Sequence, residues 1–442
     1  MTGIMKKRFK DRLIIVFGRY PEPGKTKTRL IPELGAIRAA DLQRRLTERI
    51  IQVLKKVCRK NDAGIVFFGE GGTVPDFKKW LGADMDVMLQ ADGDIGGKMA
   101  AAFTQAFRAG AKQAILVGTD IPRVSERHFQ EAFHGLSSND MVLGPSLDGG
   151  YWLIGMNRYH EVFGEIPWGT NTVFFRTKER IGRIGLSLHE LETLADIDTL
   201  DDVKTHMPKE DVRKAYVSVI IPALNEEDHI QAAVLSALDE CARVIVADGG
   251  SRDRTRDIAG NAGAFVIETQ KGRAVQQNAG AALSRGETLV FLHADTRLPQ
   301  GYSRHVFKTL LEPETVLGAF GFKTDLDSPM MRFFERAANV RAAWLNLPYG
   351  DQGLFLRRET FVHAGGFPEV PIAEDLMLVR RLSGSGRLKI VPAHAVTSGR
   401  RWKNTGLLRT FVVNQLILSG CFLGISPEKL APLYKMPGAS GR

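Results

Sequence analysis

Short apolar segments that end at an acidic residue recur along this chain of 442 residues, and they constrain its fold more than any other feature. One of them, Leu289–Leu292, ends in a polar cluster that contains Asp295. Such a run predicts a buried strand with a carboxylate projecting past its end. Ligands of open α/β sheets bind beyond these strand ends, so Asp295 is a candidate ligand of a divalent metal, magnesium or manganese. A turn or helix-cap Asp is the alternative.

The same order of strands and acidic turns occurs twice. From the first strand to a Gly-rich Asp turn, the pattern runs from Ile14 to Asp148 and again from Val219 to Asp351. A chain of this length exceeds one ordinary core, and its 44% hydrophobic and 25% charged residues are typical of a soluble globular protein. We expect two α/β domains of one architecture, 1–205 and 216–442, joined by the polar linker 206–215.

Net charge and cysteine spacing disfavour some functional classes for this chain. The net charge of +10 forms no basic tail, which favours anionic small molecules or a membrane surface over nucleic acid. The three cysteines, Cys58, Cys241 and Cys421, lack zinc spacing, so a reducing cytoplasm is the simplest location. The apolar run near the N-terminus, Leu13–Phe17, is too short for a signal peptide and is predicted to be the first strand.

A basic loop follows that strand. Gly24-Lys25-Thr26 suggests a P-loop, but Gly18 is one residue too far upstream, and Pro21 and Pro23 remove amides that would cradle phosphate. We therefore reject the P-loop and expect a loop whose cations suit a diphosphate or triphosphate, with a solvated basic loop as the alternative. The cations are Lys25, Lys27 and Arg29.

Two later strands of the first half also end at an aspartate. Residues 114–117 lead to Asp120, and residues 141–143 lead to Asp148-Gly149-Gly150. Asp120 would be a metal carboxylate, and the glycines would let the backbone approach a ligand. Since Asp-Gly is itself a turn signal, a purely structural role is the alternative for Asp148.

The stretches FGRYPEPGKTKTRL, VGTDIP and GPSLDGGYWLIG resemble a bacterial glycosyltransferase-A-like family that is related to nucleotidyltransferases such as the phospholactate guanylyltransferases. The resemblance covers about residues 11–205. It implies that Lys27 and Arg29 contact phosphates, that Asp120 holds a metal and that Asp148 lies at the nucleotide.

The second half begins with a strand that runs into polar residues. Pro222, Asn225 and Glu226 follow it, where a base and ribose would lie, and Asp248 at the next strand end can accept from a base N–H or a ribose hydroxyl. Cations for a diphosphate come next, Lys271 and Arg273.

The ordered motifs VSVIIPALNEE, VIVADGGSRDRT, KGRAVQQNAGA, FLHADT, YGDQGLFLRR, IAEDLMLVRRL and SGRRW are similar to glycosyltransferase family 2, and most similar to a subgroup of arsenosugar-biosynthesis or diaponeurosporenoate glycosyltransferases. His293 stands where the first carboxylate of the family's DxD motif would be, which leaves Asp295 as the metal ligand. The resemblance makes Asp375 the general base. The neighbouring catalytic candidates are Glu374, Asp351 and Arg401, of which the arginine would stabilise the leaving diphosphate.

Two features have a structural alternative. Glu374-Asp375 could be an acidic helix start. His394 is a candidate further metal ligand, and a structural histidine is its alternative role.

The apolar run 411–425 is shorter than the roughly 18 residues of a membrane span, so we expect core packing or dimerisation. Docking on a membrane surface is the alternative, and its cations would be Arg400, Arg401, Lys403 and Arg409.

These observations predict a bifunctional transferase with two glycosyltransferase-A-like, mostly parallel sheets. Residues 216–442 would transfer a sugar from a nucleotide-diphosphate donor to a small-molecule or lipid acceptor with inversion. Residues 1–205 would be a nucleotidyltransferase or a second glycosyltransferase; alternatively, they would bind a nucleotide or a partner without catalysis. A dehydrogenase is disfavoured because no GxGxxG follows a first strand.

Overall fold

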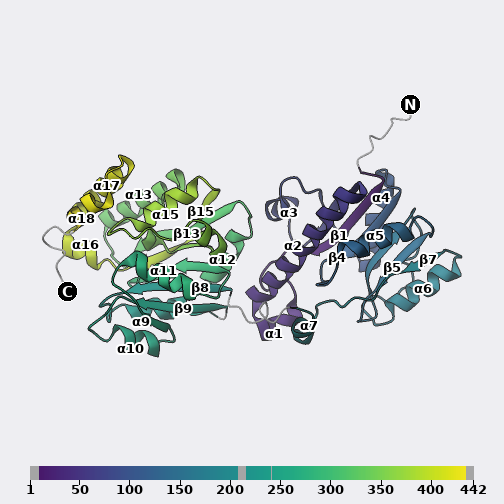
Figure 1. The fold of residues 1–442 in the computed structure, drawn as a ribbon, viewed down its shortest axis with the longest axis horizontal. Helices are drawn as coiled ribbons and strands as arrows, with labels where there is room; N and C mark the ends of the chain where they lie inside the picture. Colours follow the sequence, from purple (N-terminus) through teal and green to yellow (C-terminus); the bar gives the residue numbers. More distant parts are fainter. Residues whose placement is uncertain (1–8, 208–215, 240, 435–442) are drawn as a thin grey trace. The chain divides into compact units, whose positions relative to one another are not determined.

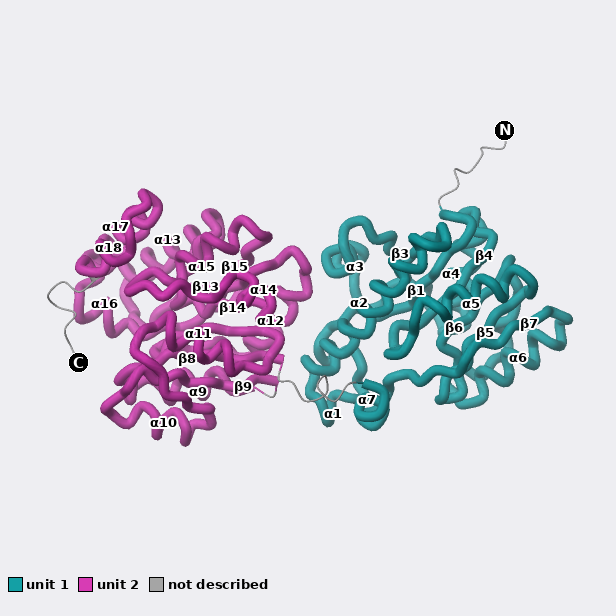
Figure 2. Tube along the Cα trace, viewed as in Figure 1, with its two compact units in different colours: residues 1–213 teal, residues 214–442 magenta. Residues whose placement is uncertain are grey.

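The structure, a computed structural model, describes residues 9–207, 216–239 and 241–434. The chain forms two compact units, Met1–Arg213 (unit 1) and Lys214–Arg442 (unit 2), which Figure 2 shows in different colours. Each unit has its own sheet and its own hydrophobic core. Except for its first two residues, the predicted linker 206–215 lies outside the described residues.

Unit 1 is built on a seven-stranded sheet of order β3-β2-β1-β4-β6-β5-β7 (Figure 1). The strands β3, β2, β1 and β4 are parallel, β6 is antiparallel to β4 and β5, and β7 is parallel to β5. This confirms the predicted mostly parallel α/β fold. The strands are β1 (Arg12–Arg19), β2 (Ala63–Glu70), β3 (Val87–Leu89), β4 (Gln113–Gly118), β5 (Met141–Pro145), β6 (Tyr151–Met156) and β7 (Leu188–Glu190).

The helices of unit 1 alternate with these strands. The longest, α2 (Ala36–Asn61), buries Leu42, Leu46, Ile50 and Leu54, a four-residue spacing that gives the helix one apolar face. This face packs against β2 and α5. The other helices are η1 (Thr28–Leu30), α1 (Ile31–Leu34), α3 (Val74–Leu81), α4 (Ile95–Arg108), α5 (Glu126–Gly135), α6 (Val173–Arg183) and α7 (Leu200–His206).

Unit 2 has an eight-stranded sheet of order β10-β9-β8-β11-β14-β13-β15-β12. Its first seven strands match the order and the directions of the sheet in unit 1, since β14 is antiparallel to β11 and β13, and β15 is parallel to β13. The strands are β8 (Val217–Ala223), β9 (Ala242–Asp248), β10 (Phe265–Glu268), β11 (Thr288–Phe291), β12 (Thr296–Arg297), β13 (Thr315–Thr324), β14 (Leu354–Arg357) and β15 (Arg387–Thr397).

Helix α11 (Arg273–Leu283) lies against β8 and β9. A Cβ atom on Gly280 would lie 2.6 Å from Cγ2 of Ile220, so this close packing requires a glycine. The other helices are α9 (Ile230–Ala237), α10 (Thr255–Asn261), α12 (Tyr302–Leu310), α13 (Pro329–Leu345), η2 (Gly350–Gln352), α14 (Arg358–His363), α15 (Glu374–Ser383), α16 (Arg400–Thr405), α17 (Leu407–Phe422) and α18 (Pro427–Tyr434).

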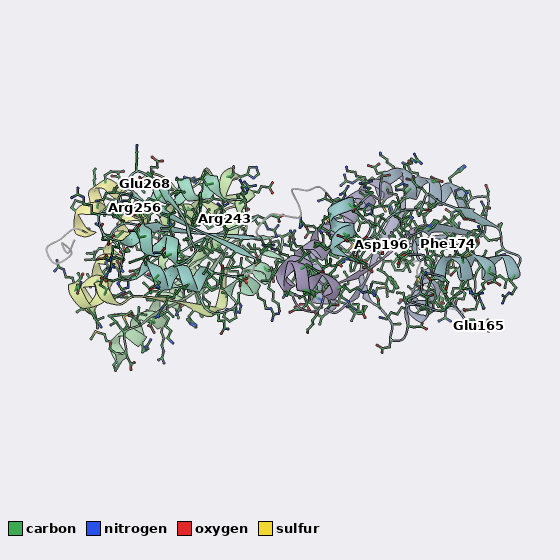
Figure 3. The ribbon with its side chains drawn as sticks, turned by 90° about the horizontal axis from the view of Figure 1, so that it is seen from below. Glu165, Phe174, Asp196, Arg243, Arg256 and Glu268 are labelled. Carbon is green, nitrogen blue, oxygen red and sulfur yellow. The ribbon has the colours of Figure 1, made fainter. Side chains whose placement is uncertain are left out.

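The outer edge of the second sheet is held by side chains that Figure 3 labels. Arg256 of α10 forms an ion pair with Glu268, which ends β10. The guanidinium of Arg243, in β9, lies 4.6 Å from the ring centre of Phe265. These contacts fix the short edge strand to its neighbours, each with a modest contribution of about 0.5–1 kcal/mol.

The apolar C-terminal run forms most of α17. Ile417 and Cys421 of this helix are buried, whereas Leu408 and Leu416 are 64% and 52% exposed. Core packing, one of the two expected roles, therefore accounts for only one face of the helix. Within the described part of the chain, no helix has both the length and the apolar character needed to cross a membrane.

Candidate active sites

In unit 2, two hydrogen-bonded loops follow β8 and β9. Asp248 is fully buried at the end of β9, and its Oδ2 accepts from the backbone N–H groups of Gly250 and Ser251 at 3.0 and 2.9 Å. Asn225 has a left-handed backbone, donates from its N–H to Ser251 Oγ, and accepts at Oδ1 from the N–H of Arg252. Both predicted nucleotide-binding side chains thus brace the loops. Oδ1 of Asp248 is buried without a hydrogen-bond partner among the described residues.

Gln276 supports the same strand ends and was missed by the sequence analysis. Its Nε2 donates to the carbonyls of Ala223 and Ala247 at 2.8 and 2.7 Å. These are the residues at the ends of β8 and β9, so α11 fixes the spacing of the two strands. The motif KGRAVQQNAGA contains this residue, and an amide in a helix face that is otherwise apolar was the available signal.

Glu226 connects the loop after β8 with α16. Both of its carboxylate oxygens accept from Arg400 Nη2, at 2.8 and 3.0 Å. Burial raises the pKa of Glu226, and the arginine opposes this shift. Pro222, also predicted here, is a buried residue of β8.

Asp295 lies in the short loop between β11 and β12. Its backbone carbonyl accepts from the N–H of Ser398 at 2.9 Å. Burial raises the pKa of its carboxyl group, and the charge of Arg400 lowers it. Burial also lowers the pKa of His293 to about 3, so this imidazole is neutral at pH 7.

Three motifs meet at Gly350. Its N–H donates to Oδ2 of Asp375 at 2.6 Å, and a Cβ atom here would lie 2.8 Å from Nε2 of His293 and 3.0 Å from that Oδ2. A larger residue would therefore displace one of these side chains. The second oxygen of Asp375 accepts from the N–H of Leu376 at 2.8 Å. The segments HAD, YGD and AED, which are far apart in the chain, thus form one site.

Two further carboxylates adjoin Asp375. Burial, opposed by the charge of Arg341 and supported by the charges of Asp375 and Asp295, raises the pKa of Asp351 to about 6. Glu374 is 2% exposed and its pKa is also raised by burial. A carboxyl group that titrates near pH 6 can take up a proton in neutral solution.

The predicted diphosphate cations are not equivalent. Arg273 Nη1 lies 3.1 Å from Oε1 of Glu374, whereas Lys271 is exposed. The charge of Arg401 acts on His293 and Asp351, which places it beside the carboxylates. Arg273 thus joins the loop before α11 to the AED motif.

A divalent metal fits this site only with help from a substrate. Among the described residues, no group of three or more His, Cys, Asp or Glu side chains is arranged to hold an ion. Magnesium in nucleotide sites, however, usually has one or two carboxylate ligands plus phosphate oxygens. Asp295, whose raised pKa a cation would lower again, fits that arrangement. His394 is an exposed residue of β15 with its ring over Gly321, which agrees with a structural role.

In unit 1, Lys27 and Asp120 lie together. Lys27 has a left-handed backbone, its side chain is 5% exposed, and its Nζ lies 3.2 Å from Oδ2 of Asp120 and 3.8 Å from Oδ1 of Asp198. It also donates to the carbonyl of Ile197. The ammonium group of the predicted phosphate ligand therefore lies beside two carboxylates, and it pairs with one oxygen of Asp120, while the other, Oδ1, has no hydrogen-bond partner among the described residues.

Arg29 and Lys25 are at the surface of unit 1. Arg29 is 78% exposed and Nη1 lies 3.0 Å from Oδ2 of Asp198, while Lys25 is exposed. The basic loop is not extended throughout, because Thr28–Leu30 forms a 3-10 turn. Of the three cations, the two exposed ones can reach a ligand without breaking a buried ion pair.

The Asp148-Gly149-Gly150 turn differs from our prediction. Oδ1 of Asp148 accepts from the N–H of Gly150 at 2.9 Å, the ordinary Asp-Gly turn. Gly149 has φ +89°, and a Cβ atom here would lie 2.0 Å from the carbonyl oxygen of Asn171. The close approach that the glycine permits is therefore with the protein's own backbone.

Asp196 and Asp198, which the sequence analysis did not single out, belong to this site. Asp196, which Figure 3 labels, accepts at Oδ1 from Ser146 Oγ at 3.1 Å, and burial and the charge of Asp148 raise its pKa. Ile197 donates its N–H to the carbonyl of Asp120 at 3.1 Å. The alternation of apolar and acidic residues in ADID was the signal for a strand-like segment at the site.

The parallel sheets and strand-end carboxylates define a pair of nucleotide-sugar-transferase-like α/β units. Residues 218–367 match the family model described as "Glycosyl transferase family 2", and residues 53–170 match "Uncharacterized protein conserved in bacteria (DUF2064)". Unit 1 thus matches an uncharacterised family, and unit 2 matches glycosyl transferase family 2, which makes the chain a glycosyltransferase. No curated protein is similar enough to count as a match.

Solved structures resemble parts of the chain. A protein of Desulfovibrio desulfuricans G20, assigned as a nucleotide-diphospho-sugar transferase, is 32% identical over 46% of this chain and 91% of its own, with a TM-score of 0.42. A Pyrobaculum calidifontis mannosyltransferase in complex with GDP-Man and Mn2+ is 20% identical (50% and 68%, TM-score 0.36). S. aureus TarS 1–349 in complex with UDP-GlcNAc is 18% identical (41% and 58%, TM-score 0.34).

Proposed function

We propose that unit 2 transfers a hexosyl group from a nucleoside-diphosphate sugar to a hydroxyl or carboxyl group of its acceptor, with inversion at the anomeric carbon. The observation that carries this proposal is the 2.6 Å hydrogen bond from Gly350 to Asp375, which supports one site shared by a base and Asp295. Direct displacement needs a base at the acceptor's oxygen and a metal at the donor's diphosphate within the same site.

In this proposal the donor's nucleoside lies over the loops that Asn225 and Asp248 brace. Asp375 takes the acceptor's proton while the acceptor oxygen attacks the anomeric carbon, and the bond from that carbon to the diphosphate breaks. Arg273 and Arg401 balance the charge that develops on the leaving diphosphate. A divalent cation held by Asp295 would supply Lewis-acid neutralisation of the same phosphates.

A donor screen tests this function. We expect one or more of the UDP- and GDP-sugars to release nucleoside diphosphate, since related solved structures bind such donors. Excess chelator or Asp295→Ala should abolish the release and weaken donor binding. Full turnover in excess chelator would refute the metal's role, and Lys271, Arg273 and Arg401 would then have to balance the charge alone. Failure of every nucleotide sugar to bind would refute the donor class.

For unit 1 we propose nucleotide binding at Arg29 and Lys25, with nucleotidyl transfer or a second glycosyl transfer as its reaction. The alternative is a module that binds a nucleotide or partner without turnover. The Lys27–Asp120 ion pair favours this alternative, because the ammonium group already neutralises the carboxylate that a catalytic metal would need. The full chain with Asp375→Asn, incubated with nucleoside triphosphates and manganese, separates the two: turnover there belongs to unit 1, and binding without turnover supports the module.

We propose a cytoplasmic location. The three cysteines, Cys58, Cys241 and Cys421, support it, because their number is odd and their spacing does not fit a zinc site. Peripheral contact with a membrane is a further proposal. The exposed apolar residues of α17 and the exposed Arg400 and Lys403 support it. Sedimentation with anionic vesicles, with and without 0.5 M salt, measures it; absence of binding at low salt would refute it.

A further inference from the structure

A cavity of about 240 Å³ lies between α13, α16 and α17 in unit 2, next to the AED and YGD segments. It is larger than the roughly 150 Å³ that holds a benzene molecule in a protein core. None of the predicted donor-binding residues lines it. Its lining combines aromatic and aliphatic side chains with a few polar ones: Phe322, Phe334, Leu345, Trp402, Phe411 and Leu418 beside Arg341, Tyr349, Asp351, Asn414 and Gln415.

The aromatic wall is ordered by stacking. The ring of Phe334 lies 4.6 Å from that of Phe411 and 5.8 Å from that of Trp402, with interplanar angles of 14° and 23°. Phe322 and Phe334 are buried in a small core cluster, against which Trp402 and Phe411 pack. The stacked rings form a rigid apolar wall that gains most from an apolar partner, and phosphates would lose hydration there without compensation.

The polar end of the cavity lies at the carboxylates of the proposed active site. Asp351 lines it and is electrostatically coupled to Asp375 and Asp295. The guanidinium of Arg341 lies 3.6 Å from the ring centre of Tyr349 and donates from Nε to the carbonyl of Leu347 at 3.2 Å. A cation fixed in this way can orient an oxygen function beside the carboxylates.

We infer that this cavity binds the acceptor, and that the acceptor is a molecule with an apolar body that ends in a hydroxyl or carboxyl group. The inference rests on the proposed glycosyl transfer. The apolar body lies along Phe334, Trp402 and Phe411, and the oxygen group points to Arg341 and Asp351. The rim continues the apolar surface, since Leu345 is 63% and the adjacent Trp344 83% exposed, so a body longer than the cavity stays in contact with apolar side chains.

Binding is tested with 2-naphthalenemethanol, a flat apolar alcohol, by quenching of tryptophan fluorescence in the full chain. We expect saturable binding that Leu345→Asp weakens at least tenfold. Val340→Asp is the matched control, because Val340 is a 55% exposed residue of the same helix that does not line the cavity, and it should bind like the unchanged protein. Equal binding by both variants, or no binding at all, overturns the inference.

Turnover distinguishes this inference from the proposed function. Donor binding and slow donor hydrolysis, measured without acceptor in the unchanged protein, test the donor site of the proposed function by itself. Dissolved 2-naphthalenemethanol, but not glycerol, should stimulate nucleoside diphosphate release if the acceptor is a free molecule. If only phosphatidylcholine vesicles that contain diacylglycerol stimulate the release, the acceptor is a membrane lipid with an apolar body and a hydroxyl group. Equal stimulation by glycerol overturns the apolar acceptor, whereas loss of donor binding in the unchanged protein would refute the proposed function instead.

Discussion

The tripeptide Asp-Gly-Gly occurs once in each unit, and the two copies are built differently. In unit 1, Asp148 is exposed and the first glycine, Gly149, has the left-handed φ of +89° and packs on the backbone of Asn171. In unit 2, Asp248 is fully buried, and the second glycine, Gly250, has φ +94° with open space around it. The same three residues therefore form a packed surface turn in one unit and a turn around a buried carboxylate in the other.

Burial of the carboxylate accounts for this difference. Asp148 makes one hydrogen bond, to its own turn, and water can replace it. Asp248, itself fully buried, accepts from two backbone N–H groups, and its other oxygen has no partner among the described residues. A buried acceptor without a donor is costly unless a ligand supplies one, which supports a nucleoside at the end of β9.

Gly149→Ala should have the largest effect. Its Cβ would lie 2.0 Å from a backbone oxygen that cannot rotate away, and its φ is left-handed, so we expect unit 1 to lose about 3 kcal/mol or more of unfolding free energy. Urea unfolding of the full chain, followed by tryptophan fluorescence, measures this. Gly150→Ala is the control, because its nearest contact is the Asp148 side chain at 3.2 Å. A loss below about 1 kcal/mol for Gly149→Ala would contradict the packed turn.

Asp375→Asn should reduce the transfer rate by about 100-fold, or about 2.7 kcal/mol in activation free energy, with donor binding nearly unchanged. Asparagine keeps the shape and removes the basicity. The Asp148→Asn variant, which is changed in unit 1, should transfer the sugar at the normal rate, since the Asp148 carboxylate accepts a hydrogen bond within its own turn. Single-turnover rates and NMR of the product's anomeric configuration are the measurements.

Two outcomes would contradict this mechanism. If Asp375→Asn turned over normally while Asp351→Asn or Glu374→Gln did not, the base would be that neighbour. A product that retained the donor's configuration would contradict direct displacement.

Asp248→Ala should cost about 2 kcal/mol of unfolding free energy, because the N–H of Gly250 and the buried N–H of Ser251 lose their acceptor. Donor binding should weaken as well. Asp148→Ala, the matched change in the exposed turn, should stay within about 0.5 kcal/mol. Equal losses in both variants would remove the distinction between the two turns.

Gly250→Ala should have the smallest effect, about 1 kcal/mol from the left-handed backbone alone, because nothing lies within 4 Å of the added Cβ. Donor titration by calorimetry should give an unchanged Kd. A much weaker Kd would mean that the donor itself approaches Gly250.

Most of the sheet was predictable because its strands are continuous apolar runs. The runs at β1, β4, β8 and β11 are buried on both faces, and such strands stand out without tertiary information. The candidate site was harder, because a side chain's partner depends on which distant segments the fold brings together. Lys27 was expected at a phosphate, yet its Nζ pairs with Asp120 and donates to the carbonyl of Ile197.

The sequence by itself determined the two mostly parallel sheets and the identity of the strand-end motifs, since hydrophobic periodicity and motif order are local properties of the chain. The tertiary structure decided everything that depends on burial and neighbours. It joined HAD, YGD and AED around Gly350, paired Lys27 with two aspartates, and opened a cavity between α13, α16 and α17. These contacts link residues far apart in the chain, and no pattern within either segment specifies the free energy of bringing them together.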